Sequence, residues 1–97
     1  MKRFGPREVR EAMEFAEAGG QALHVWEPGA MFGDKAPRVF KRYKVWAHLI
    51  DHDAERLTKT ARALGVRVIV IGRPGRRGQH IDLCGQPLER ALAQAEP

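Results

Sequence analysis

Serine and asparagine are missing from this sequence altogether, and cysteine occurs only once, as Cys84. Without serine there is no serine-triad catalysis, and without asparagine there is no acceptor for N-linked glycans. A lone cysteine cannot form a disulfide within the chain, so the fold must depend on a hydrophobic core. A reducing, cytoplasmic setting is therefore expected.

Long apolar runs are also lacking. The longest uninterrupted run extends from Val68 to Ile71, whereas a helix needs about 20 apolar residues to cross a bilayer. The first residues include Lys2 and Arg3 and none of the apolar stretch that marks a signal peptide. We therefore expect a soluble protein with no membrane partner. A chain of 97 residues supports one hydrophobic core, so residues 1–97 are expected to form one domain.

Positive charge exceeds negative charge, with a formal net charge of +5 at pH 7. The whole excess lies within residues 31–50 and 72–79, because the rest of the chain is net negative, and such a concentrated positive field attracts phosphate-bearing partners, including nucleic acid. An arginine-rich composition would by itself also place positive charge on the surface, and this alternative stays open. The candidate phosphate or nucleic-acid contacts are Lys41, Arg42, Lys44, Arg73, Arg76 and Arg77.

Apolar residues recur with helical spacing from Arg7 to Ala18 and stop at Gly19-Gly20, which predicts a first amphipathic helix. Two further helices are predicted, one after Asp51 or Asp53 and ending at Gly65, and one from Pro87 onward. We treat residues 1–20 as an addition to an α/β core formed by residues 21–97. The first helix then offers a docking or dimer surface, which would make the protein a homo-oligomer or an interaction domain.

Four strands are predicted, over residues 21–26, 44–50, 66–71 and 80–83. The near-continuous apolar run at 66–71 is typical of a strand covered on both faces in a parallel sheet. Residues 44–71 would then form a right-handed β-α-β crossover. The predicted order is α-β-β-α-β-β-α, in a small α/β sandwich with a three- or four-stranded mixed sheet.

Histidine and aspartate gather around the ends of two predicted strands. His48 is followed by Asp51 and Asp53, and His80 and Asp82 are two residues apart, which places them on the same face of a strand. These residue types suit a divalent metal ion or acid–base chemistry. Helix capping is the simpler interpretation of the two aspartates after His48, and a purely structural role explains the second pair equally well.

The loop of residues 72–78 repeats glycine at every third position among three arginines. Glycines let the backbone approach an anion closely, as in phosphate-binding turns. The spacing nevertheless matches neither the P-loop nor the dinucleotide-binding fingerprint, so a plain flexible turn remains the alternative.

The second half of the chain contains the segment VWAHLID from Val45, a predicted helix ending in Leu-Gly, and HIDL from His80 before a predicted helix with a basic residue. Over residues 23–93 this pattern resembles a small bacterial and phage family, the domain of unknown function 4031. It departs from the family at Ile81, where an aromatic residue is usual. The resemblance implies no reaction, but it implies a polar set made of His48, Asp51, His80, Asp82 and Arg90.

Three functions follow as hypotheses. The first is a binding module for nucleic acid or another phosphate-bearing ligand that uses the two basic segments. The second is a metal-dependent phosphoesterase or nuclease in which His48, His80 and Asp82 hold a divalent ion, with Glu27 or Asp51 as further ligands and Arg90 stabilising charge. The third is a protein-interaction domain that works through the first helix.

Overall fold

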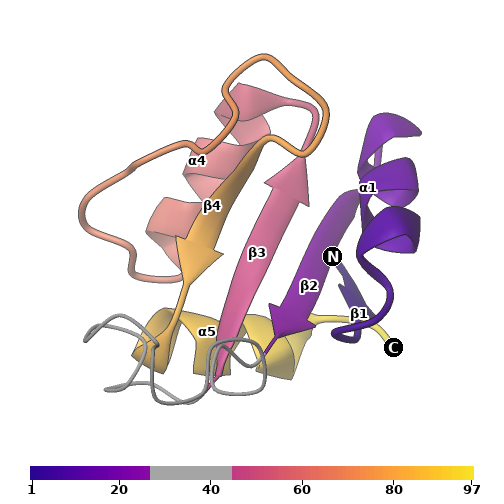
Figure 1. Cartoon of the computed structure of the whole chain (residues 1–97). Helices are drawn as coiled ribbons and strands as arrows, with labels where there is room; N and C mark the ends of the chain where they lie inside the picture. Colours follow the sequence, from indigo (N-terminus) through magenta and orange to yellow (C-terminus); the bar gives the residue numbers. More distant parts are fainter. Residues whose placement is uncertain (27–44) are drawn as a thin grey trace, which may run out of the picture.

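The computed structural model describes residues 1–26 and 45–97. Its four-stranded sheet has the order β1-β2-β3-β4, with β1 parallel to β2 and the other neighbours antiparallel (Figure 1). This confirms the predicted α/β class with a mixed sheet. The elements are β1 (Lys2–Phe4), α1 (Val9–Glu17), β2 (Gln21–Trp26), β3 (Trp46–Asp51), α4 (Ala54–Ala63), β4 (His80–Leu83) and α5 (Gly85–Gln94).

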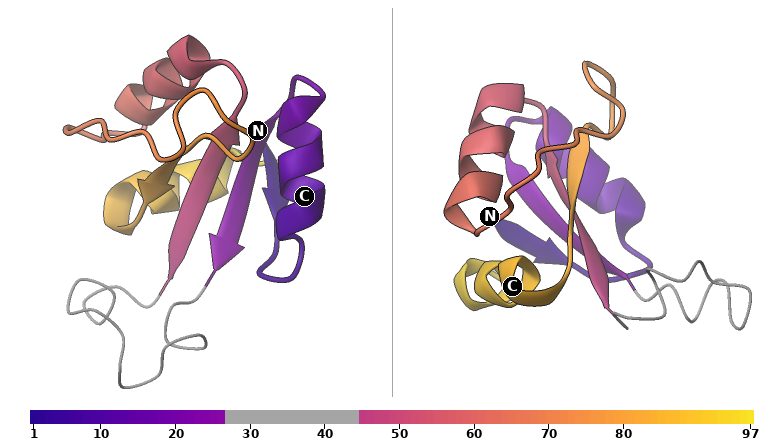
Figure 2. Two further views of the ribbon diagram at one scale, coloured as in Figure 1. Left: turned by 45° about the horizontal axis from the view of Figure 1, so that its top comes forward. Right: turned by 90° about the vertical axis from the view of Figure 1, so that its left-hand side faces the viewer.

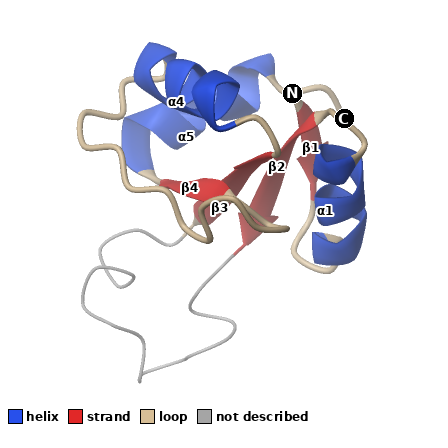
Figure 3. Cartoon of the chain, turned by 90° about the horizontal axis from the view of Figure 1, so that it is seen from above, coloured by secondary structure: helices blue, strands red, loops and turns tan. Residues whose placement is uncertain are grey.

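The helices cover both faces of the sheet. Helices α4 and α5 lie on one face and α1 on the other (Figures 2 and 3). Strand residues alternate between the two faces, so Leu23, Leu49 and Ile81 pack towards α4 and α5, while Ala22 and Ile50 pack towards α1. The described residues therefore form three layers with a hydrophobic cluster on each side of the sheet.

Helix α1 packs through Ala12 and Ala16 on β1, β2 and β3. The face of the sheet that α1 covers also carries His24, His48, His80 and Asp82. Along each strand these residues alternate with the residues that face the core under α4 and α5. In the part of the chain that the structure describes, no helix has the length and apolar character needed to span a membrane.

Helix α4 is held at both ends. The Asp53 side chain accepts hydrogen bonds from the backbone N–H groups of Glu55 and Arg56, each at 3.0 Å, which confirms the capping interpretation of Asp53. At the other end the Arg90 guanidinium, from α5, donates to the carbonyl oxygen of Leu64 at 2.9 Å. Arg90 therefore links two helices on the face opposite to the histidines.

The strand predicted over residues 66–71 is wrong, and the β-α-β crossover predicted over 44–71 does not form. Only Gly72, directly after this segment, pairs with His80, in an isolated bridge, while Val68 and Val70 are 77% and 69% exposed. Val66, Ile69 and Ile71 pack partly against the core. The apolar run is therefore a partly buried connection at the edge of the sheet. Its composition resembles that of a buried strand, which explains the wrong prediction.

The parallel crossover lies instead at the start of the chain, where α1 joins β1 to β2. The order of elements is thus β-α-β-β-α-β-α, and the predicted order missed β1. This strand is only 3 residues long and two of its residues are exposed charges, so it carries no local strand pattern. Pairing with β2 and with Glu96 at the C-terminus stabilises it.

Candidate metal centre

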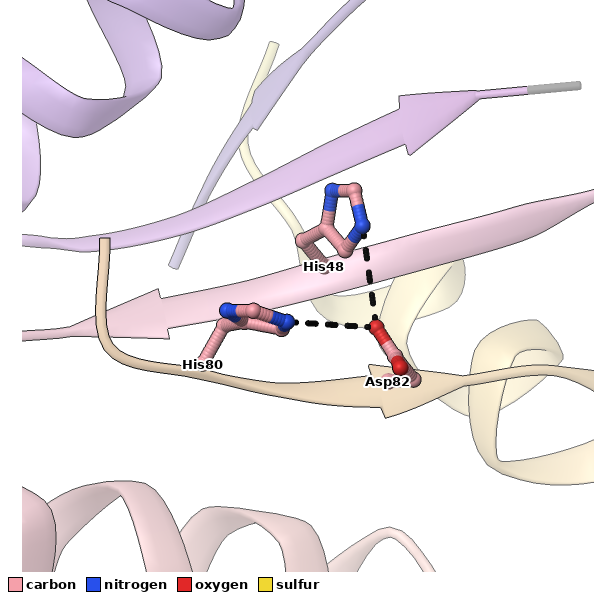
Figure 4. Close-up of side chains that lie close together, drawn as sticks. All are labelled: His48, His80 and Asp82. Atoms are coloured by element: carbon pink, nitrogen blue, oxygen red, sulfur yellow. Dashed lines mark ion pairs between the residues drawn. The ribbon is translucent and has the colours of Figure 1, made fainter. Parts of the chain in front are cut away.

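Three side chains that could bind a metal ion come together on the α1 face of the sheet. His48 projects from β3, and His80 and Asp82 project from β4 (Figure 4). The antiparallel register places His48 directly opposite Asp82, and His80 opposite Ile50. The Nε2 atoms of both histidines lie 3.6 Å from Oδ1 of Asp82. The structure therefore brings together three of the five residues in the predicted polar cluster.

These distances are too long for hydrogen bonds but suit ligands of one ion. The three donor atoms lie within 4.8 Å of one another. Two ligand atoms that share a tetrahedral ion at about 2.1 Å are separated by about 3.4 Å. Two imidazole nitrogens and one carboxylate oxygen form a donor set that Zn²⁺, Mn²⁺ and Fe²⁺ all accept, with open positions for water or substrate.

The backbone fixes which nitrogen of His80 carries the proton. Its Nδ1 lies 2.7 Å from the carbonyl oxygen of Gly78, which can only accept a hydrogen bond. Nδ1 therefore holds the proton, and in the neutral ring Nε2 presents a lone pair to Asp82. A ligand histidine that donates its other N–H to a backbone carbonyl is a common arrangement in metal sites.

A third histidine sets the tautomer of His48 in the same way. The Nε2 atom of His24 lies 3.3 Å from the carbonyl oxygen of Pro6, and its Nδ1 lies 3.1 Å from Nδ1 of His48. With both rings neutral, His24 donates through Nε2 to Pro6 and accepts through Nδ1 from His48. The ring of His48 also stacks on Trp26, with centroids 5.1 Å apart, which holds the ring between two flat neighbours. The remaining nitrogen of His48, Nε2, faces Asp82 with its lone pair.

The two lone pairs and the carboxylate thus face one another with no hydrogen-bond donor between them among the described residues. Such a cluster repels itself unless a proton or a cation sits at its centre. Burial, together with the neighbouring imidazoles of His80 and His24, lowers the pKa of His48 to about 4, so His48 is neutral at pH 7. Burial also raises the pKa of Asp82 above its ordinary value, although His80 opposes this. A divalent cation would relieve the repulsion without protonating His48.

A pocket of about 130 Å³ lies beside the cluster. His48 and His80 form one wall, and α1 contributes Val9 and Met13. Arg73, from the loop between the segment 66–71 and β4, also lines it. One of the four arginines predicted to bind phosphate therefore lies next to the candidate metal site.

Asp51 does not join the cluster, because it points to the opposite face of the sheet. It is fully buried, and Arg56 donates to both of its oxygens at 2.7 Å. Burial acts to raise the pKa of Asp51, but hydrogen bonds from Arg56, Asp53 and Gln21 outweigh it and hold the pKa below its ordinary value. Asp51 therefore anchors α4 to the sheet, and Arg90 caps α4 on that same face.

The remaining predicted residues divide into two groups. Arg76 and Arg77 are exposed on the same loop as Arg73. The predictions for Glu27 and for Lys41, Arg42 and Lys44 concern positions outside the described residues.

Sequence reasoning missed His24, although it lies on the strand predicted at 21–26. Its position at alternate spacing from Ala22 already places it on the α1 face. Local sequence patterns do not indicate that it meets His48, because that contact depends on the register of β2 against β3.

No protein-family model matches the chain, and no curated protein or solved structure matches it either. The resemblance to the domain of unknown function 4031 therefore stays a prediction. The geometry of the site carries the functional argument.

Proposed function

We propose that the chain is a divalent-metal-dependent phosphoesterase, with His48, His80 and Asp82 as the metal ligands. The observation that carries this proposal is the convergence of the Nε2 atoms of His48 and His80 on Oδ1 of Asp82, each at 3.6 Å. Three protein ligands with open positions are typical of catalytic rather than structural metal sites.

Phosphate esters are favoured as substrates because of Arg73. Its side chain lines the pocket that His48 and His80 also line, and the same loop carries Arg76 and Arg77. A positive surface next to a metal site favours a substrate that is negatively charged, and guanidinium groups bind phosphate oxygens in a fixed geometry. The basic loop, which by itself suggested a binding module, then serves the metal centre.

In this reaction an ion held by these three residues would activate a water molecule and polarise a phosphoryl oxygen. The residues of the chain hold the ion and the substrate in place. His48 and His80 bind through Nε2, because Nδ1 of each ring is committed to a neighbour. The water oxygen bonds to phosphorus, the ester P–O bond breaks, and the released alcohol takes up a proton. Arg73 neutralises the charge that develops on the phosphoryl oxygens.

The first test is metal binding by the purified, metal-free protein. We expect calorimetric titration with Zn²⁺ and Mn²⁺ to reveal a single site, with affinity reduced on the order of 100-fold or more in His80→Ala and Asp82→Asn. His52→Ala is the matched control, because His52 is exposed on the turn after β3 and outside the cluster. Equal metal affinities in His80→Ala and His52→Ala would rule out the proposed metal site.

The second test is hydrolysis. The metal-loaded protein is incubated with p-nitrophenyl phosphate and with bis(p-nitrophenyl) phosphate, and release of nitrophenol is followed. We expect at least one ester to be cleaved, with the rate abolished by chelation and in Asp82→Asn. A protein that binds the ion at this site but cleaves neither ester would rule out the proposed activity.

A further inference from the structure

The pocket beside the metal centre has two kinds of wall. Val9 and Met13 from α1 and Ile50 from β3 form an apolar wall. The two histidines of the metal centre also line the pocket, and Arg73 adds a positive charge. None of the described residues that line the pocket is a carboxylate. The pocket therefore suits a ligand with an anionic end and a small apolar part.

Arg73 is held in a backbone conformation that side chains rarely adopt, with φ of 53°. Strain of this kind persists where the surrounding structure enforces it, and it concentrates at functional sites. Gly72, directly before it, exchanges two backbone hydrogen bonds with His80, at 2.8 and 3.0 Å. The carbonyl oxygen of Arg73 also accepts from the N–H of Arg76 at 3.1 Å.

The rest of the loop is tied to the core by Gln79. This buried side chain accepts from the N–H of Gly75 at 2.8 Å and donates to the carbonyl oxygens of Asp51 and His52. The loop is therefore fixed around the position of Arg73. Within residues 1–26 and 45–97, however, the Arg73 guanidinium makes no hydrogen bond or ion pair, so its charge is available to a ligand.

We propose that this pocket binds the terminal phosphate of a phosphomonoester, with Arg73 as the residue that determines this specificity. The inference rests on the proposed function, because the metal ion supplies the second positive partner. A terminal phosphate carries close to two negative charges, which match one ion and one guanidinium. An internal phosphodiester carries one negative charge and brings two substituents.

The size of the pocket agrees with a single small group. Pockets that enclose a whole small molecule measure about 300 to 1,000 Å³, whereas this one measures about 130 Å³. It has space for the phosphate and the first carbon atoms of the ester, which would contact Val9 and Met13. The products are inorganic phosphate and an alcohol, because water supplies the oxygen that replaces the ester oxygen on phosphorus and the alcohol leaves with a proton.

The test compares a monoester with a diester in the metal-loaded protein. We expect kcat/KM for p-nitrophenyl phosphate to exceed that for bis(p-nitrophenyl) phosphate by about 10-fold or more. Arg73→Ala should lower kcat/KM for the monoester on the order of 100-fold while leaving the metal Kd unchanged. Arg62→Ala is the matched control, because this exposed arginine lies on α4, on the opposite face of the sheet.

A second variant tests the pocket itself. Val9 is 44% exposed, so Val9→Phe can fill the pocket without disturbing the core. We expect this variant to bind the metal normally and to lose monoester hydrolysis by about 10-fold or more. Full monoester activity in Val9→Phe would overturn the assignment of the pocket.

The outcomes separate this inference from the activity on which it rests. Preference for the diester, or equal effects of Arg73→Ala and Arg62→Ala, would overturn the monoester assignment and leave a phosphoesterase. Cleavage of neither ester by the metal-loaded protein would overturn the activity, and the monoester assignment with it.

Discussion

The Nδ1 atoms of His24 and His48 lie 3.1 Å apart, on neighbouring strands whose register places the two residues directly opposite each other. Their rings are stacked, with centroids 5.4 Å apart and planes inclined by 14°. Only one of the two facing nitrogens can carry the proton of this hydrogen bond. Because His24 donates its other N–H to Pro6, the shared proton belongs to His48. A residue outside the metal cluster thus determines the tautomer of a residue within it.

His24→Phe should therefore weaken metal binding by about 10- to 100-fold, since phenylalanine keeps a stacked ring but cannot accept from His48. His24→Gln should retain most of the affinity, because its side-chain oxygen can accept the same hydrogen bond. Competition with a chromophoric chelator measures both constants. Nitrogen-15 NMR of the metal-free protein gives an independent readout, with the proton of His48 expected at Nδ1. Equal losses in both variants, or a proton at Nε2, would contradict the role assigned to His24.

The stability of the metal-free protein should fall as the pH is lowered from about 6.5 to about 4. The unfolded chain binds a proton at His48 near the ordinary pKa of 6.5, whereas the folded protein does so only at about 4. Across this window the unfolded state holds more protons, so acid favours unfolding, by on the order of 2 to 3 kcal/mol.

Two carboxyl groups modify the lower part of this profile. The pKa of Asp82 is raised, so its protonation favours the folded state and offsets part of the loss. The pKa of Asp51 is lowered, so its contribution is lost only below the ordinary range of a carboxyl group. Urea unfolding between pH 7 and 4 in EDTA measures the profile. His48→Gln should flatten it above pH 4.5, and an unchanged slope in that variant would assign the dependence to other groups.

Gly72→Ala should disturb the metal site although residue 72 is not a ligand. A Cβ atom at this position would lie 2.6 Å from Cε1 and 2.7 Å from Nε2 of His80, so the ring must move. We expect a loss of metal affinity of about 10-fold or more. Gly5→Ala is the control, because its Cβ would meet only the end of the Glu8 side chain, at 3.3 Å. Normal metal binding by Gly72→Ala would contradict this prediction, because it would mean that the His80 ring can move without losing the metal ion.

Arg56→Leu should destabilise the fold without affecting the metal site. This substitution leaves the carboxylate of Asp51 buried without its cationic partner, which costs about 2 to 4 kcal/mol. The cost should shrink at low pH, where Asp51 takes up a proton. Denaturant unfolding and metal titration of the same sample distinguish the two properties. A reduced metal affinity in the folded variant would place Asp51 in the site after all.

The sequence by itself determined the local structure of most of the chain. β-Branched and aromatic residues without a breaker identified the strand at 21–26, a short strand was recognised at 80–83, and the spacing of two residues placed His80 and Asp82 on one face. A cap at Asp51 or Asp53 followed from their position before an amphipathic stretch, and the structure assigns it to Asp53. Each of these features depends on neighbours within a few positions, which is the range over which backbone geometry and side-chain direction act.

Only the tertiary structure decided which distant segments meet. The segment 66–71 has the composition of a buried strand, yet only Gly72, directly after it, pairs with β4, and Lys2–Phe4 forms a strand without a local pattern. The contact of His48 with His24, its approach to Asp82 and the separation of Asp51 from all three arise from strand register. A shift of one residue in register moves every side chain to the opposite face, and the packing of the whole sheet selects among such registers.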